Sequence, residues 1–347
     1  MKMITITNFV KNTLLIALIA VTNFSFAQEE STNEPKISIT GSVDAYYRAN
    51  LSAPNDENAI APGSSFANLP GFSLGMANFI AAYEGEKVGF VADLVFGPRG
   101  ADAVFGTPTG SANIINQMYV YWNVSESVKL TFGNFNTFLG YEVISPTANF
   151  NYSTSYLFSY GPFSHAGLKA DFDLGNDWSG MLAVMNPTDA TTFNPTGKYA
   201  FGAQLGYSGQ YLNFITDDGA FEIDYTGGFQ VSEALYLGLN AAYFDNDGTG
   251  FAGAALYPQY TTSENFTIGL RGEYFAESGV FQAIDAASNQ ADTSVFALTL
   301  TGSATIGDLT LKPELRLDNA SEEAFIDSDL TGTKNLSSFV LAAIYTF

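Results

Sequence analysis

The chain has 347 residues, no cysteine, one histidine, and 35 acidic against 13 basic residues. Without cysteine it can form no disulfide framework, thiolate metal site or lipid-modified cysteine, and its acidic excess opposes binding to nucleic acid. Charged residues make up only 14% of the chain, whereas it contains 33 Gly, 30 Phe and 19 Tyr. This composition favours a sheet with one face in an apolar medium over a helical enzyme.

The first 27 residues predict a secretory signal peptide. Lys2 and Lys11 precede a short apolar core over 14–21, and Ser25-Phe26-Ala27 forms a small-x-small cleavage site. Removal of this segment leaves 11 basic against 35 acidic residues, a net charge of −24. We expect a cleaved signal peptide over 1–27, a short periplasmic segment over 28–35, and a single domain over 36–347.

From residue 36 onward the dominant hydrophobic period is two, which is the period of a β-strand. Over 36–51, for example, Ile37, Ile39 and Val43 fall on one face, and Ser38 and Asp44 on the other. The pattern predicts an all-β, antiparallel, up-and-down transmembrane barrel of about 16 strands, within a range of 14–18. The expected strands are 36–51, 72–85, 87–97, 113–123, 128–137, 163–174, 178–187, 198–208, 210–216, 220–231, 235–245, 250–260, 265–276, 293–306, 309–318 and 336–347.

The connections between these segments carry a second signal. Short polar turns alternate with other links, most of them long, and this is typical of outer-membrane barrels. The long links are 52–71, 98–112, 138–162, 188–197, 277–292 and 319–335. A secreted β-sandwich would show the same period of two, but long strands, alternating connection lengths and one unbroken pattern favour the barrel.

The last predicted strand alternates to a terminal aromatic residue. Phe339, Leu341, Ala343, Tyr345 and Phe347 fall on one face. This ending resembles the C-terminal signal by which barrel-insertion machinery recognises its substrates. It points to insertion into an outer membrane.

One stretch of the sequence, 133–167, carries a specific pattern of residues: Gly133-Asn134-Phe135-Asn136-Thr137, Gly140-Tyr141-Glu142, Asn149, Tyr152-Ser153, Ser155, Phe158, Pro162-Phe163 and His165-x-Gly167. This pattern resembles the signature region of the OmpL-like β-barrel porin family, and Gly41 to Tyr47 resembles that family's first strand. The family's pattern contains basic residues at two positions where this chain has Asn134 and Thr154, so the resemblance implies less positive charge here. It implies an outer-membrane channel and no particular substrate.

Little in the sequence indicates catalysis. The single histidine, His165, falls on the polar face of its predicted strand with Lys169, Asp171 and Asp173. A metal site needs several ligands at matched spacing, and no Gly-x-Ser-x-Gly element surrounds a serine. We therefore expect no enzymatic activity, no cofactor and no metal. A barrel hydrolase that uses His165 is the least favoured alternative.

The long link 138–162 is both aromatic and polar, and we expect it to fold inward and narrow the lumen. Strand parity places mixed charges on the lumen face, and their acidic excess predicts a mild preference for cations. The candidate constriction residues are Glu142, Asn149, Asn151, Tyr152 and Tyr156. The candidate pore-lining residues on the wall are Asp44, Arg48, Lys129, His165, Lys169, Asp171, Asp173, Glu222, Asp224, Arg271, Glu273, Lys312, Glu314, Arg316 and Asp318.

These observations predict an outer-membrane porin, a passive diffusion channel for small hydrophilic solutes or ions. Its expected partners are outer-membrane lipids, the permeating solutes and, through Phe347, the barrel-insertion machinery. Homo-oligomers are common among such channels, but the sequence carries no signal for one. The alternative is a structural or adhesive barrel whose loops 52–71 and 319–335 bind a partner.

Overall fold

The computed structural model describes residues 37–104, 113–284 and 291–347. The predicted signal peptide and the segment 28–35 lie outside the described residues, as do parts of the links 98–112 and 277–292. All statements below concern the described residues, which belong to one compact unit over 37–347.

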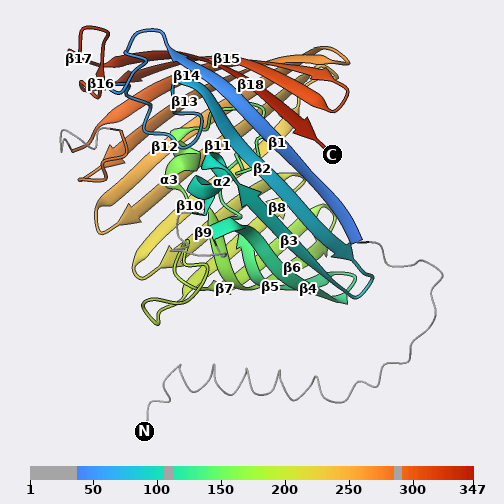
Figure 1. The fold of residues 1–347 in the computed structure, drawn as a ribbon. Helices are drawn as coiled ribbons and strands as arrows, with labels where there is room; N and C mark the ends of the chain where they lie inside the picture. Colours follow the sequence, from blue (N-terminus) through green and yellow to red (C-terminus); the bar gives the residue numbers. More distant parts are fainter. Residues whose placement is uncertain (1–36, 105–112, 285–290) are drawn as a thin grey trace. The chain divides into compact units, whose positions relative to one another are not determined.

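Sixteen antiparallel strands close into one up-and-down barrel, so the predicted fold class and strand number are confirmed (Figure 1). Each strand pairs with its neighbours in sequence, and β1 closes the barrel against β18. The strands are β1 (Ile37–Asn50), β2 (Gly71–Glu84), β3 (Val88–Phe96), β4 (Ile115–Ser125), β5 (Val128–Asn136), β6 (Ser164–Gly175), β7 (Trp178–Met185), β8 (Ala200–Tyr207), β9 (Gln210–Asp217), β10 (Ala220–Gln230), β11 (Leu235–Asn246), β12 (Thr249–Ser263), β13 (Phe266–Ser278), β14 (Ser294–Ile306), β15 (Leu309–Ala320) and β18 (Asn335–Thr346).

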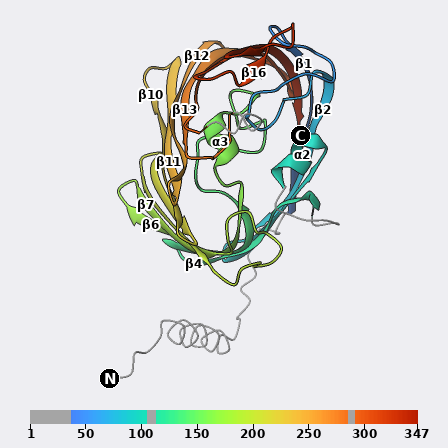
Figure 2. The same ribbon diagram turned by 90° about the vertical axis from the view of Figure 1, so that its left-hand side faces the viewer.

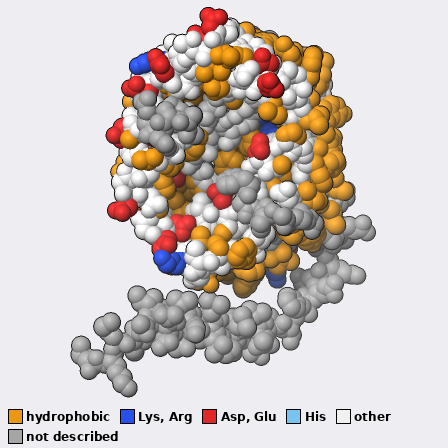
Figure 3. All heavy atoms as spheres, turned by 60° about the vertical axis from the view of Figure 1, so that its left-hand side comes forward, with side chains coloured by type: hydrophobic (Ala, Val, Ile, Leu, Met, Phe, Trp, Pro, Cys, Tyr) orange, Lys and Arg blue, Asp and Glu red, His pale blue; other side chains and the backbone are white. Residues whose placement is uncertain are grey.

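The outer face of the wall is apolar, as the period of two requires. On β5, Phe132 is 65% exposed, whereas the adjacent Thr131 is buried. On β7, exposed Leu182 alternates with buried Met181. Hydrophobic side chains cover much of the outer wall in Figure 3, which suits contact with lipid. Among the described helices, none is long and apolar enough to cross a membrane.

Short turns lie at one end of the barrel, together with the start of β1 and the end of β18. The other end carries the long connections, except for two tight turns at 218–219 and 247–248. The long connections contain α2 (Pro98–Ala103), α3 (Tyr156–Tyr160) and the hairpin of β16 (Phe325–Ile326) and β17 (Gly332–Thr333). We call these ends the short-turn end and the long-loop end.

Candidate functional site: the lumen and its inner loop

The connection between β5 and β6 folds into the barrel, as expected from its composition. Residues 137–163, which we call the inner loop, cross the lumen and carry α3 (Figure 2). The middle of the loop is buried: Tyr152, Thr154 and Ser155 have almost no exposed surface. A loop that crosses the lumen narrows it. The contacts that hold the loop in place therefore determine how much of the lumen stays open.

The short helix α3 forms because its first amides find acceptors. Ser155 caps the helix by accepting a hydrogen bond from the Phe158 amide at 3.0 Å. The Glu273 carboxylate of β13 accepts hydrogen bonds from the amides of Tyr156 at 3.1 Å and Leu157 at 2.8 Å. A negative charge at a helix N-terminus is favourable. One wall residue therefore both orients and stabilises the helix.

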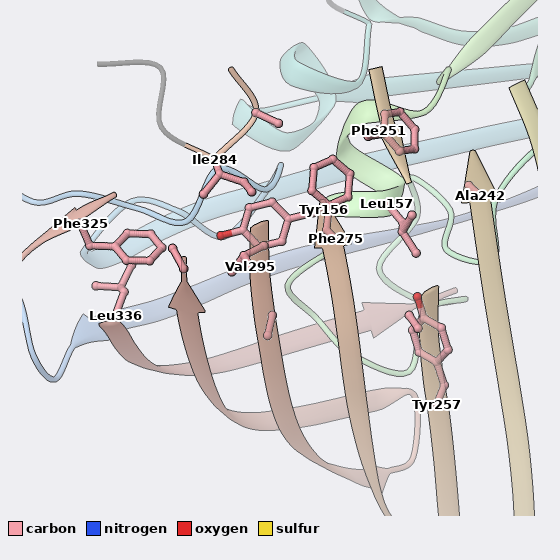
Figure 4. Packing of buried hydrophobic residues seen from close by; sticks show 14 of the residues in the cluster. Tyr156, Leu157, Ala242, Phe251, Tyr257, Phe275, Ile284, Val295, Phe325 and Leu336 are labelled. Carbon is pink, nitrogen blue, oxygen red and sulfur yellow. The ribbon is translucent and has the colours of Figure 1, made fainter. Parts of the chain in front are cut away.

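Aromatic packing fixes the other side of α3. The rings of Tyr156 and Phe275 lie 5.7 Å apart, and those of Phe251 and Phe275 lie 5.1 Å apart. Figure 4 shows these side chains, with Leu157, between the helix and strands β12 to β14. The helix thus closes off part of the long-loop end from within.

A buried ion pair fastens the start of the inner loop to its middle. Arg271 Nη1 of β13 lies 2.6 Å from Glu142 Oε1, and the two side chains are 0% and 3% exposed. The same guanidinium donates hydrogen bonds to the carbonyls of Ser153 at 2.6 Å and Thr154 at 3.2 Å. Glu142 also accepts a hydrogen bond from the Ser155 amide at 2.7 Å. This satisfaction of both charges is what makes their burial tolerable.

Strand β15 supplies a second row of anchors. Glu314 accepts hydrogen bonds from the amides of Tyr152 at 2.9 Å and Ser153 at 3.2 Å. Arg316, which pairs with Asp318 at 2.9 Å, donates to the Thr154 carbonyl at 2.9 Å. Five further hydrogen bonds anchor the loop to other elements. In three of them the donors are Lys312, which donates to the Pro146 carbonyl at 3.2 Å, Asn151, which donates to Thr301 at 2.7 Å, and Arg99 of α2, which donates to the Ile144 carbonyl at 2.9 Å. In the other two a wall carboxylate accepts: Asp44 accepts from the Tyr152 hydroxyl at 2.5 Å, and Asp224 accepts from the Gly140 amide at 3.0 Å.

Glycines in the wall make room for large side chains of the inner loop. A Cβ atom added at Gly269 would lie 2.3 Å from a ring carbon of Phe150, and one added at Gly238 would lie 2.3 Å from the Tyr141 hydroxyl. Both contacts are shorter than real Cβ atoms tolerate. The absence of a side chain at these positions lets the loop lie flat against the wall.

The last residues of the inner loop are held by the connection between β7 and β8. Asp189 Oδ1 accepts hydrogen bonds from the amides of Phe163 at 2.9 Å and Ser164 at 2.8 Å. Burial raises the pKa of the Asp189 carboxyl to about 6, although these hydrogen bonds oppose the shift. The loop exit therefore depends on a group that titrates in an accessible pH range.

Strands β3 to β6, with the end of β2, border an open cavity of about 700 Å³ toward the short-turn end. Lys129 lies over the Tyr121 ring at 4.8 Å, and Lys169 pairs with Asp171 at 3.1 Å, with both groups partly exposed. The cavity lining is polar and aromatic: Glu84, Gln117, Tyr119, Tyr121, Lys129, Thr131, Lys169 and Asp171. The inner loop is bound mainly to β1, β13 and β15 and leaves this cavity open.

The candidate site residues fall into two groups. Lys129, Lys169 and Asp171 border the open cavity, and Asp173 is exposed near the end of β6. The other candidates are buried in the interior: Asp44, Arg48, Glu142, Asn149, Asn151, Tyr152, Tyr156, His165, Glu222, Asp224, Arg271, Glu273, Lys312, Glu314, Arg316 and Asp318. Most of these hold the inner loop or shape its neighbours. Their influence on permeation stays a prediction.

Three individual placements add detail. Arg48 donates hydrogen bonds to the Asn68 carbonyl and to Asn50 Oδ1, both at 2.8 Å, and so orders the first long loop. Asn149 is bonded through both side-chain atoms to the backbone of Val143. Asn134 pairs in register with the exposed Met118. It therefore lies on the outer face, and the absence of a basic residue at this position does not change the charge of the lumen.

His165 is enclosed between the wall and the inner loop. Its Nε2 lies 3.0 Å from Thr137 Oγ1, and its ring lies 5.2 Å from that of Phe138. No group of three or more metal-ligating side chains occurs among the described residues. The surroundings of His165 suit a packing role.

Sequence reasoning missed Arg99, Asp189 and Asp217 as interior groups. Arg99 lies in α2, Asp189 in a long loop, and Asp217 at the very end of β9. Strand parity assigns faces only within strands, so it carries no information on the first two. Whether a charged side chain in a loop is buried depends on its tertiary contacts, which the sequence pattern does not show.

Comparison with family models gives one match, to the family described as "Putative beta-barrel porin-2, OmpL-like", over residues 36–347. The chain belongs to this family. The match covers the whole described barrel, so it agrees with the resemblance seen in the sequence. A search of curated proteins found no match.

Solved structures of outer-membrane channels share the fold of this porin at low sequence identity. The channel DcaP of Acinetobacter baumannii is 14% identical with a TM-score of 0.56, and 93% of this chain covers 100% of that one. The anion-selective porin from Comamonas acidovorans is 11% identical with a TM-score of 0.57, at 90% and 100% coverage. Salmonella typhi OmpF, solved in a complex with daunomycin, is 11% identical with a TM-score of 0.60, at 92% and 100% coverage.

Proposed function

We propose that this porin is a passive diffusion channel of the outer membrane for small hydrophilic solutes and ions. One observation carries the proposal: the inner loop is bound to β1, β13 and β15, and an open polar cavity of about 700 Å³ remains beside β3 to β6. Diffusion needs no covalent step or cofactor. The loop supplies a size limit and the uncovered wall supplies polar contacts.

The charges that act on a permeating ion are those without a close partner. Arg271, Glu142, Arg316 and Asp318 neutralise one another behind the loop. We therefore expect the chain's overall excess of 35 acidic over 13 basic residues to give a mild cation preference. The Comamonas structure is of an anion-selective porin with a similar fold, so selectivity must come from side chains rather than from the fold.

The test is to refold the mature chain into a planar bilayer and to record single-channel currents across a KCl gradient. We expect stable conductance steps and a reversal potential on the cation side of zero. A reversal potential that favours Cl⁻ would overturn the cation preference and leave the channel intact.

Liposome swelling separates the channel from the adhesive alternative. Vesicles that contain the folded barrel should swell in small sugars if solutes pass. A correctly folded, inserted barrel that neither conducts nor permits swelling would make the inner loop a plug, and a structural or adhesive function through loops 52–71 and 319–335 would replace this proposal.

A further inference from the structure

A second cavity lies at the long-loop end, between the exit of the inner loop and strands β9 to β11. It measures about 540 Å³. Its lining includes Tyr160, Pro162, Asp217, Glu222 and Phe244. Its rim carries exposed residues at the tight turn 218–219 and at Asn246, so it opens to solvent. Figure 3 shows acidic side chains at several separate points around the rim of the barrel.

Two neighbouring carboxylates on β10 differ in how they are satisfied. Asp224 accepts hydrogen bonds from the Asn213 side chain at 2.7 Å, from Asn240 and from the Gly140 amide. Glu222, one inward position along the strand, is only 4% exposed. Within residues 37–104, 113–284 and 291–347, no hydrogen-bond donor or cation contacts the Glu222 carboxylate. A buried carboxylate without a donor is costly.

A second carboxylate in the same cavity also has a free oxygen. Asp217 Oδ2 accepts a hydrogen bond from the Thr188 amide at 2.7 Å, but its buried Oδ1 has no partner among the described residues. By contrast, the exposed Asp218 at the rim already pairs with Lys198. Of the four carboxylates in the described lining, Asp189 accepts two backbone hydrogen bonds and Asp218 pairs with Lys198, whereas Glu222 and Asp217 Oδ1 are left as acceptors, and the lining contains no basic side chain.

Aromatic side chains lie beside these carboxylates in the lining. Phe244 faces Glu222 across the β10–β11 pair, and Tyr160 comes from α3 with its hydroxyl donating to the Ala283 carbonyl at 2.7 Å. A Cβ added at Gly161 would lie 3.8 Å from Glu222 Oε1, so the loop backbone at Gly161 passes close to the carboxylate. Aromatic faces beside carboxylates suit a cation with an aliphatic body.

We propose that this cavity is a binding site for small organic ammonium solutes, with Glu222 and Asp217 accepting the N–H groups and Tyr160 and Phe244 contacting the aliphatic part. This inference rests on the proposed channel function and names a solute class for it. A bare metal ion would leave the apolar lining unused. The site would concentrate amines at the long-loop end before they pass the inner loop.

The test uses n-butylammonium chloride on the refolded full barrel in a planar bilayer, with 1-butanol as the neutral probe. We expect concentration-dependent interruptions of the current with the amine alone. Glu222→Gln should weaken the apparent affinity by about tenfold or more, because it replaces a charge-assisted hydrogen bond. Asp217→Asn should weaken it to a lesser degree. Glu264→Gln, at a turn of the opposite end, is the matched control and should change nothing.

Saturation-transfer NMR of the amine with the barrel in detergent separates the site from the channel. Binding that depends on Glu222 in a barrel that does not conduct would keep the site and overturn the channel. If the barrel conducts, and if Glu222→Gln and Asp217→Asn leave the block by the amine unchanged, the binding site is overturned and the channel is kept. Equal effects of the variants on K⁺ and on the amine would also overturn it, since any monovalent cation would then suffice.

Discussion

At the scale of single residues, the lumen is organised by charges whose partners are backbone groups. Arg271 binds one carboxylate and two carbonyls of the inner loop, and Glu314 binds two of its amides. Both side chains are buried, so each would be costly if left alone. These residues act as positioning groups for the loop. We expect them to affect a permeating solute only through the position of the loop.

Replacement of Arg271 with Met should destabilise the barrel by about 3–5 kcal/mol, because Glu142 would lose its ion-pair partner while it stays buried. The free energy of unfolding in urea, measured in lipid vesicles, gives the value, and single-channel current noise should rise as the loop loosens.

Lys198→Met is the matched control, since its pair with Asp218 is 60% and 50% exposed and should contribute about 0–1 kcal/mol. The double variant Arg271→Met/Glu142→Met should recover part of the loss. A single Arg271→Met variant as stable as Lys198→Met would show that the ion pair does not hold the loop.

Asp189 should make the free energy of unfolding of the barrel depend on pH. Its pKa in the folded state is about 6, above the ordinary 3.8, so the folded protein binds this proton more tightly than the unfolded one. Its contribution to the free energy of unfolding is therefore greatest below about pH 4, declines between pH 4 and 6, and is flat above.

Asp189→Asn keeps the acceptor for the amides of Phe163 and Ser164 but removes the titration. The free energy of unfolding of the wild type minus that of the variant should be more positive at pH 4 than at pH 7. Urea unfolding at both pH values measures this difference. A difference independent of pH would contradict the assignment.

At the scale of elements, the strands follow from local pattern and the inner loop does not. The segment predicted at 36–51 forms β1 over Ile37–Asn50, because alternating side chains suit a wall with one apolar face. Pro313 leaves a local gap in the β14–β15 register, which passes from Thr301↔Glu314 to Ala304↔Leu311. Helix α3 was not predicted, because five residues form a helix here only with Glu273 supplied from the wall.

The inward course of the loop could be expected from its mixture of aromatic and polar residues, but the wall on which it packs could not. Strand parity places Glu314 and Lys169 alike on the inner face. Only the closed barrel shows that Glu314 holds the loop while Lys169 borders open space. The unpartnered state of Glu222 is equally invisible in sequence, since it depends on what the loop leaves uncovered.

The fit of the loop against the wall can be tested with one added methyl group. Gly269→Ala places a Cβ 2.3 Å from the Phe150 ring and should cost about 1–3 kcal/mol through forced repacking. Gly272→Ala on the same strand is the control, because its nearest neighbour is Leu298 at 3.9 Å.

Limited proteolysis of the inner loop in the refolded protein should become faster in Gly269→Ala than in Gly272→Ala. Equal rates and equal stabilities would mean that Phe150 yields without disturbing the loop.

At the scale of the whole molecule, the barrel presents an apolar exterior, an interior crossed by one loop, and two ends of unlike chemistry. The cavity near the short-turn end contains Lys129 and Lys169, whereas the cavity at the long-loop end contains acids and no base in its lining. This asymmetry predicts that an asymmetric insertion into a bilayer should give different amine block from the two sides.

Substitution of Phe347 tests the prediction that the barrel-insertion machinery recognises this residue, apart from any role it has in intrinsic folding. Its ring lies 5.6 Å from that of Phe79, and its backbone exchanges two hydrogen bonds of 3.0 Å with Gly41. Phe347→Ala keeps the backbone bonds, so we expect refolding in pure lipid vesicles at near wild-type yield. In cells we expect the amount in the outer membrane to fall several-fold, as measured by heat-modifiable gel mobility.

Tyr345→Ala serves as the control, since Tyr345 is also an exposed aromatic residue of β18. A similar fall for both variants would indicate general loss of lipid contact. A marked refolding defect of Phe347→Ala without the machinery would assign the residue to barrel closure instead.

The seam between β1 and β18 has a consequence for the order of events in folding. Every other strand pair joins segments that follow each other along the chain, and can form as soon as both are present. The seam joins the first strand to the last and must wait for all sixteen, so the contact of greatest sequence separation is also the slowest to form. Until then two edge strands carry unsatisfied backbone groups. The time to close this seam, rather than the formation of any hairpin, should limit the rate at which the barrel becomes watertight.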